Sequence, residues 1–145
     1  MTALTWAEVA GRLATSRNYW VGVTGKDGAP HASPVWGVVV DDVLYFYTET
    51  TTAKARNLRA DPRIVVHLEN GDDVLIVRGS VEETTAPDLL ARVLAAFAPK
   101  YDAPDDLQYL PVGPPGEVVF ALVPSTAMTW SLDGYDSSQR RWSAR

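Results

Sequence analysis

The 145-residue sequence has no cysteine and only two histidines and two methionines. Without cysteine it has no disulfides, no thiolate metal ligands and no thiol nucleophile. His31 and His67 lie far apart and lack the spacing of a metal-binding motif, so we predict no metal site. No Ser-His-Asp order, Walker loop or GxGxxG motif is present. These absences leave no residue to which a catalytic role can be assigned.

Positive charge and long apolar runs are also scarce. The net charge of −5 and the pI of about 4.9 argue against a nucleic-acid-binding surface. No apolar segment approaches the roughly 18 residues of a membrane span, and no basic region followed by an apolar run opens the chain. We therefore expect a cytoplasmic protein that binds neither nucleic acid nor a membrane. Its length predicts a single domain over residues 1–145.

The hydrophobic pattern is that of a mainly β protein with flanking helices. It predicts six strands, over Tyr19–Thr24, Pro30–Val40, Val43–Thr48, Arg63–Glu69, Asp73–Glu83 and Glu117–Val123. It also predicts helices over Thr5–Thr15, Thr52–Ala60 and Pro87–Tyr101, a proline-rich irregular loop over Asp102–Gly116, and a tail that starts as strand and then becomes polar. Six short strands with few helices favour a closed or nearly closed antiparallel barrel.

Several of these strands are apolar on both faces, as in Val38–Val40, Ile64–Val66 and Val74–Val77. The outer face of a lone small barrel should be polar, which would give an alternating pattern. A helix or a second subunit must therefore cover the outside. Because the predicted helices are too few to cover the whole barrel, we expect a homodimer.

A hydroxyl-rich turn follows the strand that ends at Tyr47 and Thr48. Thr50, Thr51 and Thr52 then lead into a short helix that carries Lys54, Arg56 and Asn57. Free N–H groups, hydroxyls and cations at a strand-to-helix junction suit an anion, most simply a phosphate. A lysine near a helix N-terminus opposes the helix dipole unless an anion is present. The junction predicts a site for a phosphorylated cofactor.

The alternative for this junction is a solvated basic face. In that interpretation Lys54, Arg56, Arg59 and Arg63 form salt bridges with Glu49 and Asp61.

The second strand contains Ser33-Pro34-Val35-Trp36-Gly37. A proline inside a strand marks an edge, a bulge or a backbone exposed to a ligand. Trp36 and Gly37 would give a flat apolar wall and a close backbone approach for an aromatic ring. The alternative is an edge strand with a core tryptophan. Near the C-terminus, Tyr135 and Arg140–Trp142 either close a pocket over a bound ring or form a frayed tail.

These residues resemble a known family. Pro30–Trp36, Leu44–Thr48 and Lys54–Arg63, in this order and spacing, resemble the pyridoxamine 5′-phosphate oxidase-like split-barrel superfamily, in particular its flavin/deazaflavin oxidoreductase branch. The resemblance covers about residues 5 to 125. It implies a six-stranded split barrel that dimerises and binds the deazaflavin F420, or alternatively FMN, in grooves at the dimer interface. It implies hydride transfer with a small organic substrate.

The resemblance also implies roles for ten residues. Ser33, Pro34, Val35 and Trp36 would line the tricyclic ring, and Tyr47, Thr48, Thr52, Lys54, Arg56 and Asn57 would hold the phosphate end. The segment Arg140–Trp142 would reach toward the cofactor pocket of a partner subunit.

Two departures from the family pattern argue against vitamin B6 oxidation. Ala53-Lys54 stands where authentic pyridoxamine phosphate oxidases have an Arg-Lys pair, and their C-terminal Arg-x-His element is missing. Two alternatives to an oxidoreductase remain at this stage. One is a cofactor carrier without turnover, and the other is a haem-binding split barrel in which His31 or His67 is the axial ligand.

Overall fold

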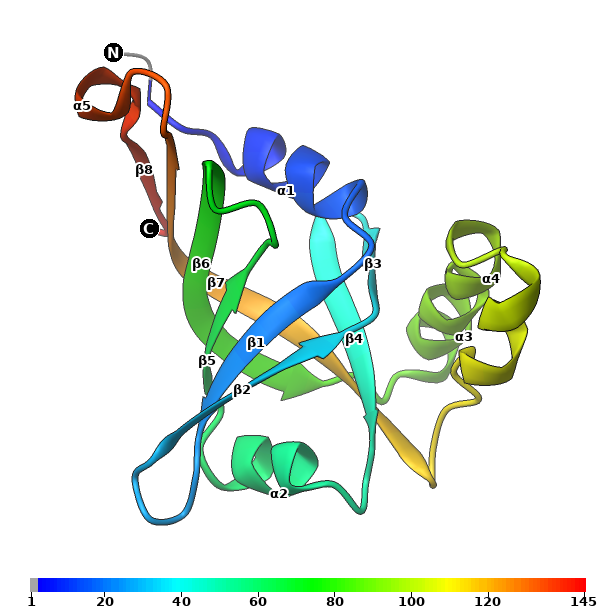
Figure 1. Cartoon of the computed structure of the whole chain (residues 1–145). Coiled ribbons are helices and arrows are strands. Elements are labelled where there is room, and N and C mark those ends of the chain that lie inside the picture. Colours follow the sequence, from blue (N-terminus) through cyan, green and yellow to red (C-terminus); the bar gives the residue numbers. More distant parts are fainter. Residues whose placement is uncertain (1–2) are drawn as a thin grey trace.

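The computed structural model describes residues 3–145, and its main feature is one antiparallel sheet that curls into a split barrel (Figure 1). The mainly β class with flanking helices is confirmed. The strands are β1 (Tyr19–Thr24), β2 (Pro30–Val35), β3 (Gly37–Val40), β4 (Val43–Glu49), β5 (Arg63–His67), β6 (Asp73–Glu83), β7 (Glu117–Ser131) and β8 (Arg140–Ser143). They pair in the order β2-β1-β5-β6-β7-β4-β3, with β8 added to β7.

The predicted count of six strands is wrong, since the described residues form eight. The predicted strand Pro30–Val40 breaks at Trp36, because its two halves pair with different neighbours, β1 and β4. The last predicted strand continues past Val123 to Ser131. The tail then supplies β8, which pairs antiparallel with β7.

The helices are α1 (Trp6–Ala14), α2 (Ala53–Ala60), α3 (Pro87–Ala95), α4 (Phe97–Lys100), the 3₁₀ helix η1 (Pro104–Tyr109) and α5 (Tyr135–Ser138). The predicted helix Pro87–Tyr101 is therefore two helices that meet at Ala96. Pro99 explains this break, because it has no N–H to continue the helical hydrogen bonds. No helix within residues 3–145 is both long and apolar enough to cross a membrane.

The main core fills the inside of the barrel. Alternating strand residues such as Val21, Phe46 and Val77 point inward, and α1 and α2 close opposite ends of the barrel with Leu13 and Leu58 (Figure 1). Thr5 caps α1 as predicted, because its Oγ1 accepts the N–H of Glu8 at 3.2 Å.

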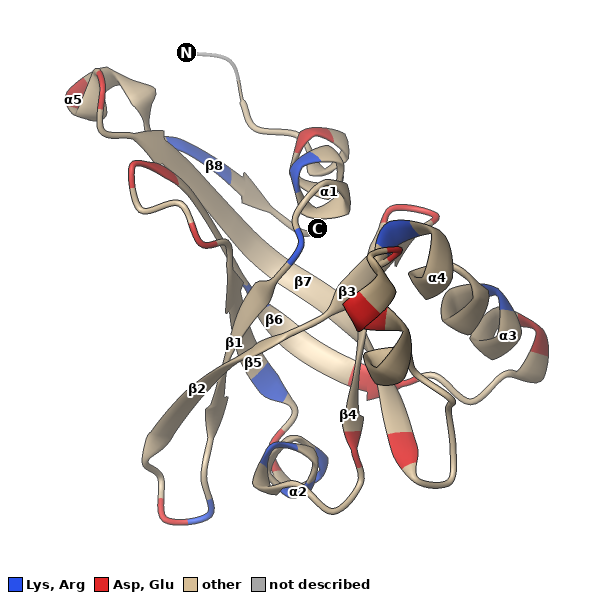
Figure 2. Ribbon diagram, turned by 45° about the vertical axis from the view of Figure 1, so that its right-hand side comes forward, with Lys and Arg blue, Asp and Glu red and all other residues tan. Residues whose placement is uncertain are grey.

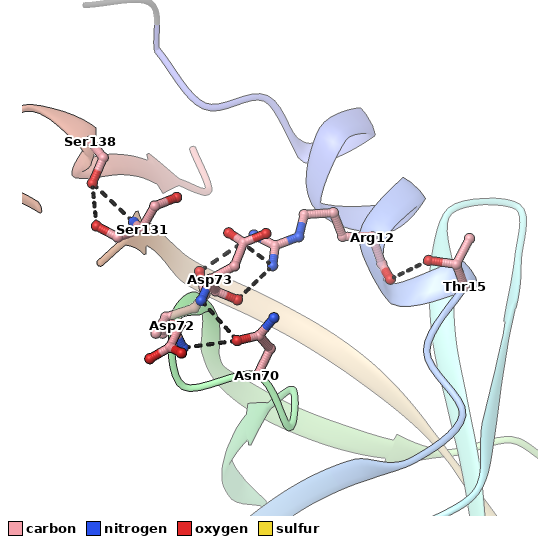
Figure 3. Close-up of polar contacts among 8 residues, drawn as sticks. Arg12, Thr15, Asn70, Asp72, Asp73, Ser131 and Ser138 are labelled. Carbon is pink, nitrogen blue, oxygen red and sulfur yellow. Dashed lines mark hydrogen bonds and ion pairs between the residues drawn. The ribbon is translucent and has the colours of Figure 1, made fainter. Parts of the chain in front are cut away.

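The C-terminal turn of α1 is hydrogen-bonded to the turn between β5 and β6 (Figure 3). A guanidinium nitrogen of Arg12 donates to the carbonyl oxygen of Asp73 at 2.9 Å and lies 3.5 Å from its carboxylate. Asn70 Oδ1 accepts the N–H groups of Asp72 and Asp73 and so closes the turn. These contacts hold α1 over one mouth of the barrel.

A second core lies outside the barrel. There α3 and α4 pack against the outer face of β3, β4 and β7 through Val93, Phe97 and Tyr101. The prediction that helices cover part of the outer face is confirmed for this side. The two cores place α2 at one end of β4 and the α4–η1 segment beside the break at Trp36, which positions the candidate site between them.

Candidate functional site

The predicted junction between strand and helix is present, and Thr52 is its centre. Thr52 is the N-cap of α2: its Oγ1 accepts the N–H of Ala55 at 3.2 Å and donates to the carbonyl oxygen of Glu49 at 2.8 Å. The hydroxyl of Thr48 lies 3.1 Å from that of Thr52. The side chain of Thr52 therefore holds the start of α2 in place, and its hydroxyl hydrogen is directed to Glu49.

Two cavities meet at Lys54. The larger, of about 420 Å³, lies between the end of β4, the break after β2 and η1, and it is lined by Asn18, Pro34, Val35, Trp36, Tyr47, Thr48, Glu49, Thr52, Lys54 and Tyr109. The smaller, of about 280 Å³, lies between β2 and α2 and is lined by Val23, His31, Ala32, Ser33, Ala53, Lys54 and Asn57. The first volume falls in the usual range of small-molecule sites.

Nine of the ten predicted site residues line one of these two cavities. Ser33 and Asn57 line the smaller cavity, Lys54 lines both, and the other six line the larger. Arg56 lines neither. Its guanidinium instead donates to the carbonyl oxygen of Thr51 at 2.7 Å on the exposed side of α2.

Lys54 differs from the other cations near α2. Arg59 pairs with Glu83 at 2.5 Å, and Arg63 pairs with Asp61 at 2.6 Å. The solvated-face alternative therefore holds for Arg63 with its predicted partner Asp61, whereas Arg59 is paired with Glu83 instead of Glu49 or Asp61. Within residues 3–145, Lys54 makes no hydrogen bond or ion pair, although it is half-buried. Figure 2 shows how Lys and Arg gather on α2 at the end of the barrel.

Burial also affects the protonation of this lysine. Desolvation lowers the pKa of Lys54 below its usual value, because a cation loses water there without gaining a carboxylate. An anion in either cavity would restore the lost interaction. Lys54 is therefore the residue that most clearly prepares this site for a negatively charged group.

Aromatic side chains form the other end of the larger cavity. Trp36 stacks on Tyr101 with ring centroids 4.1 Å apart, and Tyr109 meets it edge-on at 6.1 Å. The hydroxyl of Tyr47 donates to the carbonyl oxygen of Tyr109, which ties η1 to β4. With Pro34 these groups form an apolar wall suited to a flat ring.

The sequence interpretation missed Asn18, Glu49 and Tyr109 as lining residues. Tyr109 lies in the proline-rich segment, far from β2 in the sequence, and only the tertiary fold brings it to Trp36. The sequence shows only a tyrosine in a proline-rich segment, and this signal does not identify Trp36 as its neighbour.

The two histidines occupy different places. His31 is exposed and lines the smaller cavity. His67 is half-buried on β5, with its ring parallel to that of Trp20 at 6.3 Å and Nδ1 2.8 Å from the carbonyl oxygen of Leu68.

The C-terminal segment forms β8 and packs on α1, so the frayed-tail alternative is wrong. Arg140 donates two hydrogen bonds to the carboxylate of Glu8, at 2.7 and 3.1 Å. Trp142 lies 4.9 Å from Trp6 between ring centroids. Neither residue lines the two cavities at Lys54 in its own chain.

The family is decided by sequence. A profile of the family described as pyridoxamine 5′-phosphate oxidase matches residues 5–131. The chain belongs to this family. No curated protein matches it.

Several solved structures share the family's fold. A conserved hypothetical protein of Mycobacterium tuberculosis is 25% identical with a TM-score of 0.70, over 97% of this chain and 86% of its own. An F420 reductase is 25% identical with a TM-score of 0.63, over 80% of this chain and 93% of its own. A haem-binding protein of Mycobacterium smegmatis is 19% identical with a TM-score of 0.75, over 99% of this chain and 60% of its own. The last likeness concerns the fold alone.

Proposed function

We propose that this protein is an oxidoreductase that transfers a hydride between a bound F420, or alternatively FMN, and a small organic substrate. The observation that carries the proposal is Lys54, a half-buried cation without a carboxylate partner within residues 3–145, placed where two cavities meet. One of these cavities ends in an aromatic wall. A ring joined to a phosphate has the shape and charge that this arrangement fits.

Each part of the groove has a defined task. Lys54 would supply charge to the phosphate, and the amide of Asn57 would donate a hydrogen bond to it. The hydroxyl of Thr48 would do the same only after its hydrogen turns away from Thr52. Arg56 would contact the phosphate only if its guanidinium gives up its hydrogen bond to the carbonyl oxygen of Thr51. The Pro34–Trp36 backbone and the ring of Trp36 would hold the tricyclic ring. The cofactor supplies the hydride chemistry when bound, and the protein binds it, orients it and excludes water.

Room beyond Lys54 favours F420 over FMN. FMN ends at its phosphate, whereas F420 continues beyond it into an acidic, peptide-like chain. The smaller cavity, of about 280 Å³, opens on the far side of Lys54 from Trp36 and offers the polar groups of Ser33, His31 and Asn57. It gives such a chain a place to lie.

We also propose that two copies of the chain associate through the outer face of β1, β5, β6 and β7. Trp20, His67, Ile76 and Met128 are register neighbours on this face. All four are half-buried, and α3 and α4 lie on another side of the barrel (Figure 1). Within residues 3–145 no helix covers these four side chains, three of which are apolar, and such a face suits contact with a second copy. Sedimentation that shows a 15.8 kDa monomer at micromolar concentration would contradict the dimer.

The test of the cofactor site uses Lys54→Ala, with Arg59→Ala as the matched control on the same helix. We expect Lys54→Ala to weaken F420 or FMN binding by about 1.5–3 kcal/mol, the loss of one charge-assisted contact. Arg59→Ala should change affinity little, because Glu83 already neutralises that arginine. Fluorescence titration measures both. Equal affinity of Lys54→Ala and the wild type for both cofactors would contradict the assignment.

The same titration separates the alternatives. Of the two histidines considered as haem ligands, His31 lines the smaller cavity, whereas His67 lines neither cavity. A Soret band on addition of haemin, with no binding of F420 or FMN, would replace the proposal by haem binding. A cofactor that binds but is never reduced or oxidised in the presence of candidate substrates would favour a carrier.

A further inference from the structure

Trp36 lies outside the ladder of the sheet. The register of β2 with β1 ends at Val35, and the register of β3 with β4 begins at Gly37. Residues outside the sheet must therefore fix the tryptophan that forms the ring end of the groove. Those residues lie at the end of α4.

Tyr101 stacks on one face of Trp36 and hydrogen-bonds to the backbone of Gly37. Its side chain is fully buried, and its ring plane lies within 6° of that of Trp36. The phenol oxygen accepts the N–H of Gly37 at 3.0 Å and donates to the carbonyl oxygen of Arg17 at 2.6 Å. A single side chain thus sets both the tilt of Trp36 and the backbone that carries it.

Lys100 holds the other polar group of Gly37. Its Nζ donates to the carbonyl oxygen of Gly37 at 2.7 Å and to the hydroxyl of Tyr19 at 2.6 Å. Tyr19 in turn donates to the carbonyl oxygen of Leu13 in α1. Two consecutive residues of one segment therefore clamp both backbone groups of Gly37.

The ion pair between Arg17 and Asp106 joins Lys100 and Tyr101 to η1, the helix whose Tyr109 lines the larger cavity. Arg17 lies 5.0 Å from the centroid of Trp36 and donates to both carboxylate oxygens of Asp106, at 2.8 and 3.2 Å. Asp106 belongs to η1, which ends at Tyr109 against the edge of Trp36. The segment from Lys100 to Tyr109 thus contacts Trp36 from two sides.

We propose that Lys100 and Tyr101 are positioning residues for the ring end of the groove, acting through Gly37 and Trp36. This inference rests on the proposed function, because it concerns the same ring. Neither residue lines the cavity. Their effect on a bound ring must pass through the tryptophan that they hold.

The charge of Lys100 should make the effect of Lys100 and Tyr101 on ring binding depend on pH. Desolvation lowers the pKa of Lys100 to about 8. The groups that face Lys100 have pKa values further from neutral pH. Burial raises the pKa of Tyr19, and it raises the pKa of Tyr101 to about 12. The hydrogen bonds between Arg17 and Asp106 raise the pKa of Arg17 and lower the pKa of Asp106. Within this cluster, Lys100 is the group that changes charge between pH 7 and 9.

The first test compares Tyr101→Phe with the matched control Tyr45→Phe, at a buried tyrosine of β4 that lines neither cavity. The probes are riboflavin and the corresponding phosphate-free deazaflavin, which present the ring alone. We expect Tyr101→Phe to weaken ring binding about fivefold or more, the effect of losing the hydroxyl hydrogen bonds at Gly37 and Arg17. In a separate titration with FMN, the inhibition constant of inorganic phosphate, which displaces the cofactor's phosphate end at Lys54, should stay unchanged. Tyr45→Phe should bind like the wild type, because the hydroxyl of Tyr45 makes no hydrogen bond within residues 3–145.

The second test follows the ring probe from pH 7 to 9 in the wild type and in Lys100→Met. Wild-type affinity should fall about threefold or more as the ammonium becomes a neutral and weaker donor. Lys100→Met should be flat across this range, and Lys100→Arg should retain the affinity seen at low pH. A merely structural role would alter the melting temperature without removing this pH dependence.

The outcomes separate the two proposals. If the wild type binds no flavin or deazaflavin, the proposed function fails and the positioning role falls with it. If the wild type binds the ring and Tyr101→Phe binds it equally well, the positioning role alone is overturned. The same holds if Lys100→Met keeps the wild-type pH dependence.

Discussion

The hydroxyl oxygens of Thr48 and Thr52 lie 3.1 Å apart and connect the buried end of β4 to the N-cap of α2. This contact fixes the start of α2, and with it Lys54, relative to the sheet. The site is therefore built on a strand end and a capped helix, which are two rigid elements.

Loss of the cap should destabilise the protein and loosen the site. Thr52→Ala removes the acceptor of the Ala55 N–H and should lower the free energy of unfolding by about 1 kcal/mol. Thr52→Ser keeps the hydroxyl and should stay close to the wild type. Urea unfolding measures both. A serine variant as unstable as the alanine variant would contradict the capping role.

Two glycines should respond to alanine in opposite directions. At Gly79, an added Cβ would lie 2.1 Å from the carbonyl oxygen of Val123, where the register between β6 and β7 shifts and Ser125 of β7 has no register partner on β6. Gly79→Ala should therefore cost more than about 2 kcal/mol, since the backbone must move. At Gly11, in the middle of α1, the Cβ meets no atom within 4 Å. Gly11→Ala should add about 0.5–1 kcal/mol to stability in thermal or urea unfolding.

Alkaline pH should weaken the fold through its buried phenols. Burial raises the pKa of Tyr47 and Tyr101 to about 12, above the ordinary value of 10.0. Below pH 10 both states keep these protons, and the contribution to stability is fully present. Between pH 10 and 12 the unfolded chain releases them first, so stability is lost. The pKa of Lys100 is shifted in the opposite direction, from 10.5 to about 8. Its deprotonation therefore adds stability between pH 8 and 10.5 and changes stability no further above that pH.

The measurement is urea unfolding at several pH values between 10.5 and 12. Tyr101→Phe lacks one of the phenols and should show a shallower loss over this range. A loss as steep as that of the wild type would mean that Tyr101 does not contribute.

The C-terminal strand should contribute stability through its contact with α1. Trp142 is half-buried and lies 4.9 Å from Trp6. Trp142→Ala should cost about 1–3 kcal/mol, less than a fully buried tryptophan. Leu132→Ala, at a side chain that is 64% exposed, is the control and should change stability by less than about 0.5 kcal/mol. If both variants unfold at the same urea concentration, the anchoring role is wrong.

Local signals in the sequence predicted much of the fold. The strands Tyr19–Thr24 and Asp73–Glu83 have the predicted bounds, and Thr5 is the predicted cap of α1. The sequence predicts that the second helix begins at Thr52, which is instead its N-cap. The failures are non-local. The break at Trp36 depends on which neighbours its two flanking strands find, and β8 depends on pairing with β7 rather than on its own polar composition.

The candidate site divides in the same way. Lys54, Thr48 and Asn57 stand together because they share one strand-helix junction, which the sequence displays directly. Arg56 is on the same helix, but its guanidinium turns to the carbonyl of Thr51, a choice of side-chain rotamer that the sequence does not determine. Tyr109 and Tyr101 reach Trp36 only through the path of α3, α4 and η1, so no local pattern identifies them.

The break at Trp36 also has a mechanical consequence. The two edges of the sheet path are β2 and β3, and they are consecutive in the chain. The barrel is therefore closed there by a covalent hinge of one residue and not by a ladder of hydrogen bonds. The larger cavity is lined by Pro34, Val35 and Trp36, so a bound molecule would lie against a part of the barrel wall that no strand pairing closes.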